Sequence, residues 1–418
     1  MSRNSISQAA LDVLYQLHKS GYQAFLVGGG VRDVLLGRIP KDFDIVTNAR
    51  PEQVKKLFSY CRLIGRRFVL AHVHQRGEII EVATFRAHHN TGVAGEGVTE
   101  NGRIVRDNVY GTLDEDAVRR DFTINALYYD ISDFSVLDYA NGLADLQAGV
   151  IRLIGDPVVR YQEDPVRMLR AARFAAKLGF SIETESAELI PQLGGLLGNI
   201  PPARLFEEVL KLFLSGHATE SYVQLQHYNL FKQLFPYTED CLKNPIARAF
   251  VEQMLRNTDQ RIRENKPVMP AFLLAAFLWP ALLPNLPSKS LKGMNQQEVW
   301  LDAFQRLLAR QQKYVAIPRR VSVLIQEIWR LQLRLTRSRR GKNKCLSVLK
   351  HPRFRAGYDF LLLRAQAGET DLAEEAAWWT EFLDNHPEVN QGSSTVSAPF
   401  SPKKRLRRRK YKNKKEKG

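Results

Sequence analysis

The sequence has few cysteines and no apolar run long enough to cross a membrane. Its three cysteines, Cys61, Cys241 and Cys345, lie far apart and match no metal-ligand spacing. We therefore expect reduced, buried thiols in a cytoplasmic protein. The most apolar run, residues 271–283, is shorter than a membrane span and contains Pro280, so it predicts a buried core helix and no transmembrane segment.

Acidic residues are fewer than basic ones: the chain has 44 Asp and Glu and 61 Lys and Arg, which gives a net charge of +17. This balance favours a polyanionic partner, either nucleic acid or an anionic membrane surface. Residues 401–418 alone carry eleven Lys or Arg against one Glu and have no periodic apolar side. We expect this tail to be disordered and to bind phosphate backbones in a salt-sensitive way, the alternative being a solubilising tail.

The rest of the chain is organised around residues 24–47. Residues 24–27 are an apolar run of strand type, the glycines Gly28, Gly29 and Gly30 break it, and helical spacing resumes over residues 31–36. Backbone amides at such a strand-to-helix turn can cradle phosphate. The alternative is a tight turn without a ligand.

A carboxylate pair follows this turn at short range. Phe43, Ile45 and Val46 mark a second strand, on which Asp42 and Asp44 project from the same face. Two such carboxylates repel each other unless a cation lies between them, and Mg²⁺ prefers oxygen ligands. The joint pattern predicts two-metal phosphoryl or nucleotidyl transfer, the alternative being a solvated strand edge.

A single acid, Glu81, interrupts the apolar strand at residues 79–83. A lone carboxylate there is costly unless it is paired or binds metal, which makes Glu81 the natural third metal ligand. The alternative is an acid on an edge strand that faces water.

Two further clusters carry charge at places where helices are expected. Arg119, Arg120 and Asp121 stand where a helix would begin: the arginines fit phosphate, while Asp121 can accept from a ribose hydroxyl or orient the arginines. The alternative is a surface ion pair without function.

Residues 163–178 predict a helix with Pro165 in its first turn. Asp164, Arg167 and Arg170 recur on one face of it and offer donors and acceptors to the edge of a nucleobase. An intrahelical stripe of salt bridges explains the same spacing.

Six motifs occur in unbroken order up to about residue 215. They are LVGGGVRD (26–33), KDFD (41–44), IEVATFR (80–86), RRDFTINAL (119–127), NGLADL (141–146) and EDPVRMLRAARFAAKLG (163–179). On these motifs the sequence resembles the bacterial class II nucleotidyltransferases, which comprise poly(A) polymerases and tRNA CCA-adding enzymes.

The resemblance implies an α+β nucleotidyltransferase head, a small mixed β-sheet with helices, followed by an all-α neck and body. We place the catalytic head at residues 1–155, the helical neck with its base-reading helix at 156–220, and the helical RNA-binding body at 221–388. A disordered basic RNA-binding tail takes up 389–418.

The resemblance also implies roles for individual residues. Asp42 and Asp44 match the metal-binding carboxylates and Glu81 the third acidic position; with Asp121 they form the expected catalytic set. The expected nucleotide contacts are Gly28, Gly29, Gly30, Arg32, Arg120, Asp164, Arg167 and Arg170, of which Asp164 and Arg167 read the base. The expected RNA contacts of the tail are Lys403, Lys404, Arg405, Arg407, Arg408, Arg409 and Lys410.

The branch is indicated by residues 63–73 (LIGRRFVLAHV), which look like the poly(A) polymerase signature, and by residues 316–320, 328–334 and 351–365, which resemble its C-terminal domain. The resemblance implies template-independent addition of AMP from ATP to RNA 3′ ends with release of pyrophosphate. It implies two Mg²⁺ ions, largely single-stranded RNA substrates, and RNA-decay proteins as partners. The alternative is a CCA-adding enzyme, which would also take CTP.

Overall fold

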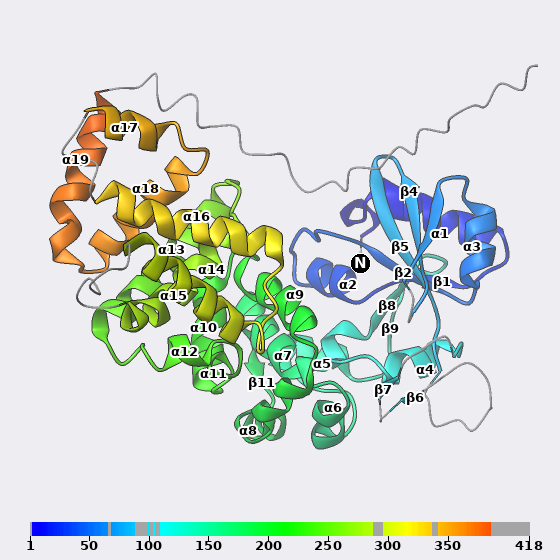
Figure 1. Cartoon of the computed structure of the whole chain (residues 1–418). Helices are drawn as coiled ribbons and strands as arrows, with labels where there is room; N and C mark the ends of the chain where they lie inside the picture. Colours follow the sequence, from blue (N-terminus) through cyan, green and yellow to red (C-terminus); the bar gives the residue numbers. More distant parts are fainter. Residues whose placement is uncertain are drawn as a thin grey trace, which may run out of the picture. The chain divides into compact units, whose positions relative to one another are not determined.

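The computed structural model describes residues 2–65, 68–87, 99–100, 103–104, 109–286, 296–336 and 342–385 (Figure 1). The chain forms two compact units, residues 1–326 and 327–418. The expected division into head, neck, body and tail is finer than this and stays a prediction. The expected RNA contacts of the tail, residues 403–410, lie outside the described residues.

The first unit begins with a seven-stranded mixed sheet in the order β3-β4-β5-β2-β1-β8-β9. Neighbours pair antiparallel except β2 and β5, which are parallel. The strands are β1 (Ala24–Val27), β2 (Asp44–Thr47), β3 (Cys61–Ile64), β4 (Leu70–Gln75), β5 (Glu78–Thr84), β8 (Leu127–Asp130) and β9 (Val136–Asp138). The predicted strands at residues 24–27 and 43–46 are thus central strands of this sheet.

Short helices surround the sheet: η1 (Arg3–Ser5), α1 (Gln8–Lys19), α2 (Gly29–Leu35), α3 (Pro51–Leu57), α4 (Leu113–Val118), η2 (Thr123–Asn125) and α5 (Gly142–Ala148). α1 and α3 pack on the strands and on each other. Two small ribbons, β6 (Thr99–Glu100) with β7 (Arg103–Ile104) and β10 (Val150–Ile151) with β11 (Ser181–Ile182), complete the β-structure. Most of residues 86–109 lies outside the described residues.

One face of the sheet carries a compact apolar cluster beside α4. Its buried members are Phe25, Val27, Val46, Phe85, Ala117 and Tyr128. Because Phe25 pairs with Val46 and Val27 with Asp44, the carboxylate of Asp44 continues this row of side chains beyond the apolar core. The core therefore fixes the position from which Asp44 projects.

Helices make up the remainder of the first unit. They are α6 (Pro157–Glu163), α7 (Val166–Leu178), α8 (Thr184–Leu193), η3 (Gly194–Asn199), α9 (Pro202–Phe213), α10 (Ala218–His227), α11 (Phe231–Leu234), α12 (Pro236–Glu239), α13 (Pro245–Arg263), α14 (Pro270–Leu282), η4 (Leu283–Asn285) and α15 (Gln296–Gln311). α14 is the predicted buried helix, with eleven buried residues. Within the described part of the chain, no helix combines the length and the apolarity that a membrane span requires.

The second unit contains the end of α16 (Arg319–Leu335), then α17 (Lys342–Leu349), α18 (Phe354–Gln366), η6 (Thr370–Leu372) and α19 (Ala373–Asp384). Trp379 is fully buried in its core and donates its indole N–H to the carbonyl of Leu335 at 3.1 Å. The fold as a whole confirms the prediction of a mixed-sheet head followed by a helical body.

Two local predictions need correction. The helix expected over residues 163–178 is present as α7 but begins at Val166, and Glu163 is instead the last residue of α6. Pro165 disfavours helical backbone in the residue before it, and Asp164 accordingly has φ −145° and ψ 90°. Arg119, Arg120 and Asp121 follow the end of α4 instead of beginning a helix; the acids Asp114–Asp116 occupy its first turn.

Candidate active site

The glycine turn joins β1 to α2 and packs against the segment that carries the carboxylates. Gly28 has φ 73° and ψ −133°, a conformation that side-chain-bearing residues rarely adopt. A Cβ on Gly30 would lie 3.2 Å from the carbonyl oxygen of Asp42 and 3.1 Å from the ring of Phe43. The absence of side chains at these glycines therefore allows the turn to approach Asp42.

The three predicted metal-binding acids lie along neighbouring strands. Asp44 is the first residue of β2 and is the register partner of Glu81 on β5, while Asp42 precedes the strand by two residues. Asp44 keeps access to solvent, yet surrounding protein atoms desolvate it. This desolvation, together with the charges of Glu81 and Asp42, raises the pKa of Asp44 to about 6, against an opposing effect of Arg120.

The side chains of Asp42, Asp44 and Glu81 are exposed, and we call this group the acidic edge. Among the described residues, no group of three or more His, Cys, Asp or Glu side chains is arranged to hold a metal ion. Glu81 lies 3.2 Å from the imidazole Nε2 of His72 on β4. The donor set at Asp42 and Asp44 nevertheless fits a hard divalent cation, because such cations prefer carboxylate oxygens and the raised pKa of Asp44 shows that its lone charge is disfavoured.

Arg120 is held beside the glycine turn by two residues that the sequence analysis missed. Its Nη2 donates to the Asp116 carboxylate at 2.8 Å and its Nε to the Tyr128 hydroxyl at 2.8 Å. The Tyr128 hydroxyl in turn donates to Asp116 at 2.9 Å. Burial alone would lower the pKa of Arg120, but Asp116 and Tyr128 more than offset it and the net shift is upward. Its Nη1 lies 3.6 Å from where a Cβ on Gly28 would stand.

Arg32 lies on α2, almost completely buried at 2% exposure. Its Nε and Nη2 donate to Asp33 at 2.8 and 2.6 Å, and its Nη1 donates to Asn125 at 2.5 Å. Lys177 on α7 reaches the other oxygen of Asp33 at 3.1 Å. This network ties the glycine turn to the helix that follows the head.

Asp121 and Arg170 meet directly, with 2.6 Å between the carboxylate Oδ2 and the guanidinium Nη2. The other oxygen of Asp121 accepts from the backbone N–H of Phe122 at 2.9 Å. The sequence placed these two residues in separate motifs, and the fold of α7 against the segment after α4 brings them together.

Asp164 and Arg167, the predicted base-reading pair, have separate partners. The carboxylate of Asp164 accepts from Arg204 on α9 at 2.6 Å. Arg167 donates to the carbonyl of Arg160 at 2.6 Å and to Glu163 at 3.0 Å. The alternative of an intrahelical salt-bridge stripe among Asp164, Arg167 and Arg170 is therefore wrong, because each of the three pairs with a residue outside the set.

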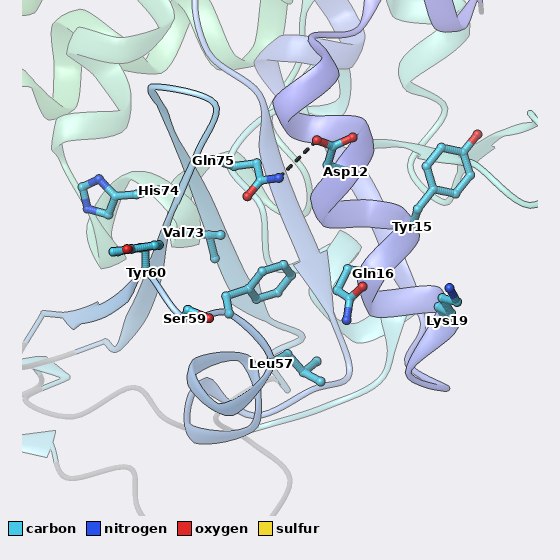
Figure 2. Close-up of a pocket in the computed structure, with 11 residues that line it drawn as sticks. Asp12, Tyr15, Gln16, Lys19, Leu57, Ser59, Tyr60, Val73, His74 and Gln75 are labelled. Atoms are coloured by element: carbon cyan, nitrogen blue, oxygen red, sulfur yellow. Dashed lines mark hydrogen bonds between the residues drawn. The ribbon is translucent and has the colours of Figure 1, made fainter.

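A hollow of about 500 Å³ lies on the head, apart from the acidic edge (Figure 2). It is lined by residues of α1, of the segment after α3, and of β4, including Val73. Val73 alternates with His72, the register partner of Glu81, and so lies on the opposite face of the sheet from Glu81. The carboxylate that lines the hollow, that of Asp12, already accepts hydrogen bonds from Gln8, Gln75 and Arg76. This hollow is therefore separate from the acidic edge.

Comparison with known proteins identifies the family. A profile described as "Poly A polymerase head domain" matches residues 24–152, "Probable RNA and SrmB-binding site of polymerase A" matches 179–242, and "Polymerase A arginine-rich C-terminus" matches 292–415.

Poly(A) polymerase I of Escherichia coli O6:H1 is 50% identical over 98% of this chain and 89% of its own length. A CCA-adding enzyme of Bacillus pumilus is 37% identical over 56% of this chain and 57% of its own. Among solved structures, the Bacillus stearothermophilus CCA-adding enzyme in complex with CTP has a TM-score of 0.61 at 24% identity, covering 93% of this chain and 84% of its own, which shows a common fold. The chain belongs to the poly(A) polymerase I family of nucleotidyltransferases, and the CCA-adding enzymes are its more distant relatives.

Proposed function

We propose that the chain transfers AMP from ATP to the 3′-hydroxyl of RNA at the edge formed by Asp42, Asp44 and Glu81. The 3′-oxygen forms a bond to the α-phosphorus, the bond from that phosphorus to the bridging oxygen breaks, and pyrophosphate leaves; the hydroxyl proton passes to water. The observation that carries this proposal is the placement of a carboxylate edge, a glycine turn and the guanidinium of Arg120 beside one another.

Asp42 and Asp44, with Glu81 beside them, would hold two Mg²⁺ ions, whose charge when bound acidifies the 3′-hydroxyl and neutralises the triphosphate. The raised pKa of Asp44 supports this assignment, since a site that disfavours a lone carboxylate charge gains from a cation. No histidine is required as a base, because the hydroxyl proton leaves to solvent.

The Gly28–Gly30 turn, Arg32 and Arg120 form the proposed triphosphate site. Asp116 and Tyr128 fix the guanidinium of Arg120 before ATP arrives, so binding requires little reorganisation. Arg32 is engaged by Asp33 and Asn125, which supports a role in holding the turn, while its phosphate contact is proposed from the resemblance alone.

Asp164 and Arg167 form the proposed reader of the incoming base. Adenine and cytosine both present an amino donor beside a ring-nitrogen acceptor, so hydrogen bonding alone separates them poorly. The ion pairs Asp164–Arg204 and Arg167–Glu163 hold the two readers in fixed positions, and a fixed pair favours one size of base. Asp121, paired with Arg170, is placed to act on the ribose or to orient arginines.

We further propose that the RNA is largely single-stranded and that the basic residues 403–410 hold its phosphates with little sequence preference. We also propose that the chain acts in the cytoplasm, in RNA processing and decay, together with RNA-decay proteins.

The test is incorporation of labelled ATP, and separately CTP, onto a generic single-stranded RNA and onto a tRNA lacking its CCA end, with and without Mg²⁺. Long extension of the generic RNA with A alone, dependent on Mg²⁺, is the expected result. Short extension confined to tRNA and requiring CTP would overturn the assignment of base selection.

A further inference from the structure

A pair of tyrosines and an arginine meet on the first unit, away from the acidic edge. Tyr237 belongs to α12, Arg310 to the last turn of α15, and Tyr314 to the segment that follows α15 (Figure 1). The two rings lie 6.0 Å apart at 85°, and the guanidinium carbon of Arg310 lies 4.1 Å from the centre of the Tyr237 ring. Both rings are half-buried, and Arg310 and Lys313 are exposed.

The fold brings these distant residues together through a buried support. α14 packs against both α12 and α15. The side chain of Gln311, fully buried, donates to the carbonyl of Leu234 just before α12 at 2.7 Å. A buried hydrogen bond therefore links the two segments that carry the rings.

The charges around these rings are positive. A hydrogen bond from Arg310 lowers the pKa of the Tyr237 hydroxyl, with smaller lowering effects of a hydrogen bond from Tyr314 and of the charge of Lys313. Arg306, one turn earlier on α15, pairs with Asp302, whereas Arg310 forms no ion pair within the described residues. An exposed cation that lies over an aromatic ring and has no carboxylate partner is suited to a ligand that is both flat and anionic.

Single-stranded RNA has this chemistry. Its unpaired bases stack on aromatic rings and on guanidinium planes, and its backbone supplies the negative charge. Tyr237 lies in the stretch matched by the RNA-binding profile, residues 179–242, and Arg310 and Tyr314 lie in the stretch matched by the arginine-rich profile, residues 292–415. The platform is a place where these two stretches touch.

We propose that Tyr237, Arg310 and Tyr314 form a platform that stacks a base of single-stranded RNA, with Lys313 contacting the adjacent phosphate. This inference rests on the proposed function, because the RNA concerned is the strand that is being extended.

The test measures binding of the full chain to fluorescent oligo(A) and to an abasic oligomer of the same length. Tyr314→Ala and Arg310→Lys each weaken binding to oligo(A) about tenfold, since a lost stacking contact removes base affinity. Both variants bind the abasic oligomer like the unaltered chain, because neither loses a charge. Tyr314→Phe keeps the ring and binds oligo(A) normally. Arg306→Ala is the matched control: it removes a charge from α15 and reduces binding to both oligomers equally and slightly.

Oligo(A) binding by Arg310→Lys and Tyr314→Ala equal to that of the unaltered chain would overturn the platform. So would an equal loss on the two oligomers, which would indicate a phosphate contact only. Thermal unfolding of each variant separates lost contacts from lost folding, and Arg310→Lys keeps the test decisive if Tyr314→Ala unfolds. Failure of the unaltered chain to extend RNA with ATP would overturn the proposed function instead.

Discussion

Replacing Asp116 tests whether the site is organised by its buried counter-charge. The Asp116 side chain is 7% exposed and that of Arg120 is 23% exposed, and Asp116→Asn removes the carboxylate to which the guanidinium is bonded, leaving the nearby charge of Asp44 to oppose it. Breaking a fully buried ion pair costs about 3–5 kcal/mol. Because Arg120 keeps some water contact and still donates to Tyr128, we expect about 2–3 kcal/mol in the free energy of unfolding.

The assay is urea unfolding of the full chain, read as a fall in the midpoint with an unchanged slope. Asp12→Asn is the matched control, because the partner of Asp12, Arg76, is 59% exposed. The free energy of unfolding of Asp12→Asn should fall by less than about 1 kcal/mol. A loss for Asp116→Asn no larger than for Asp12→Asn would refute the counter-charge role.

Ligand binding gives the second readout of Asp116→Asn. A misplaced Arg120 weakens ATP binding about tenfold, the worth of one hydrogen bond to a charged group. Binding of adenosine, which has no phosphates, stays unchanged. An equal loss for ATP and adenosine would mean that the substitution disturbs the base site, and that Arg120 is not the phosphate contact.

Three further outcomes follow from the same geometry. Asp44→Asn abolishes AMP incorporation and the Mg²⁺-induced rise in Tm. Without metal and above pH 6, this variant is more stable than the unaltered chain, because folding raises the pKa of the Asp44 carboxyl from 3.8 to about 6 and its ionisation therefore costs folding stability; equal Tm values at pH 8 in EDTA would contradict this. Arg204→Ala frees Asp164 and raises CTP incorporation relative to ATP about tenfold, measured as the ratio of kcat/KM values, and an unchanged ratio would remove Arg204 from base selection. Deleting residues 401–418 weakens RNA binding and flattens its salt dependence, so a deletion with the full-length slope would exclude the tail from the contact.

Local sequence patterns predicted the parts of the site that short-range physics determines. The alternation of apolar residues around Asp44 and the break at Gly28–Gly30 determine a strand and a turn, and the structure has both. The parallel pairing that makes Glu81 the partner of Asp44 joins strands far apart in the chain. The sequence singled out Glu81 only by the cost of an acid in an apolar strand.

The missed residues are those whose role depends on a distant partner. Arg204 lies 40 residues after Asp164, and Asp33 pairs with Lys177 over 144 residues. No periodicity links such positions, since tertiary packing creates both contacts: it brings α9 to the segment before α7, and α2 to the end of α7. The pairing of Asp116 with Arg120 could have been predicted, because the two residues are four positions apart, which is a helical spacing. It was missed because a helix was expected to begin at residues 119–121, where α4 has just ended.

Two ion pairs of the proposed site join an expected substrate contact to a residue of opposite charge on another element. Asp121 with Arg170 and Asp164 with Arg204 connect the head segment and α9 to the region of α7. Pairs of this kind reduce the net charge that the empty site must bury, and they fix donors and acceptors before substrate binds. The acidic edge is the exception, because desolvation and the neighbouring charges of Glu81 and Asp42 raise the pKa of Asp44. We therefore propose that the protein itself organises the nucleotide contacts, while a bound cation stabilises the ionised form of Asp44.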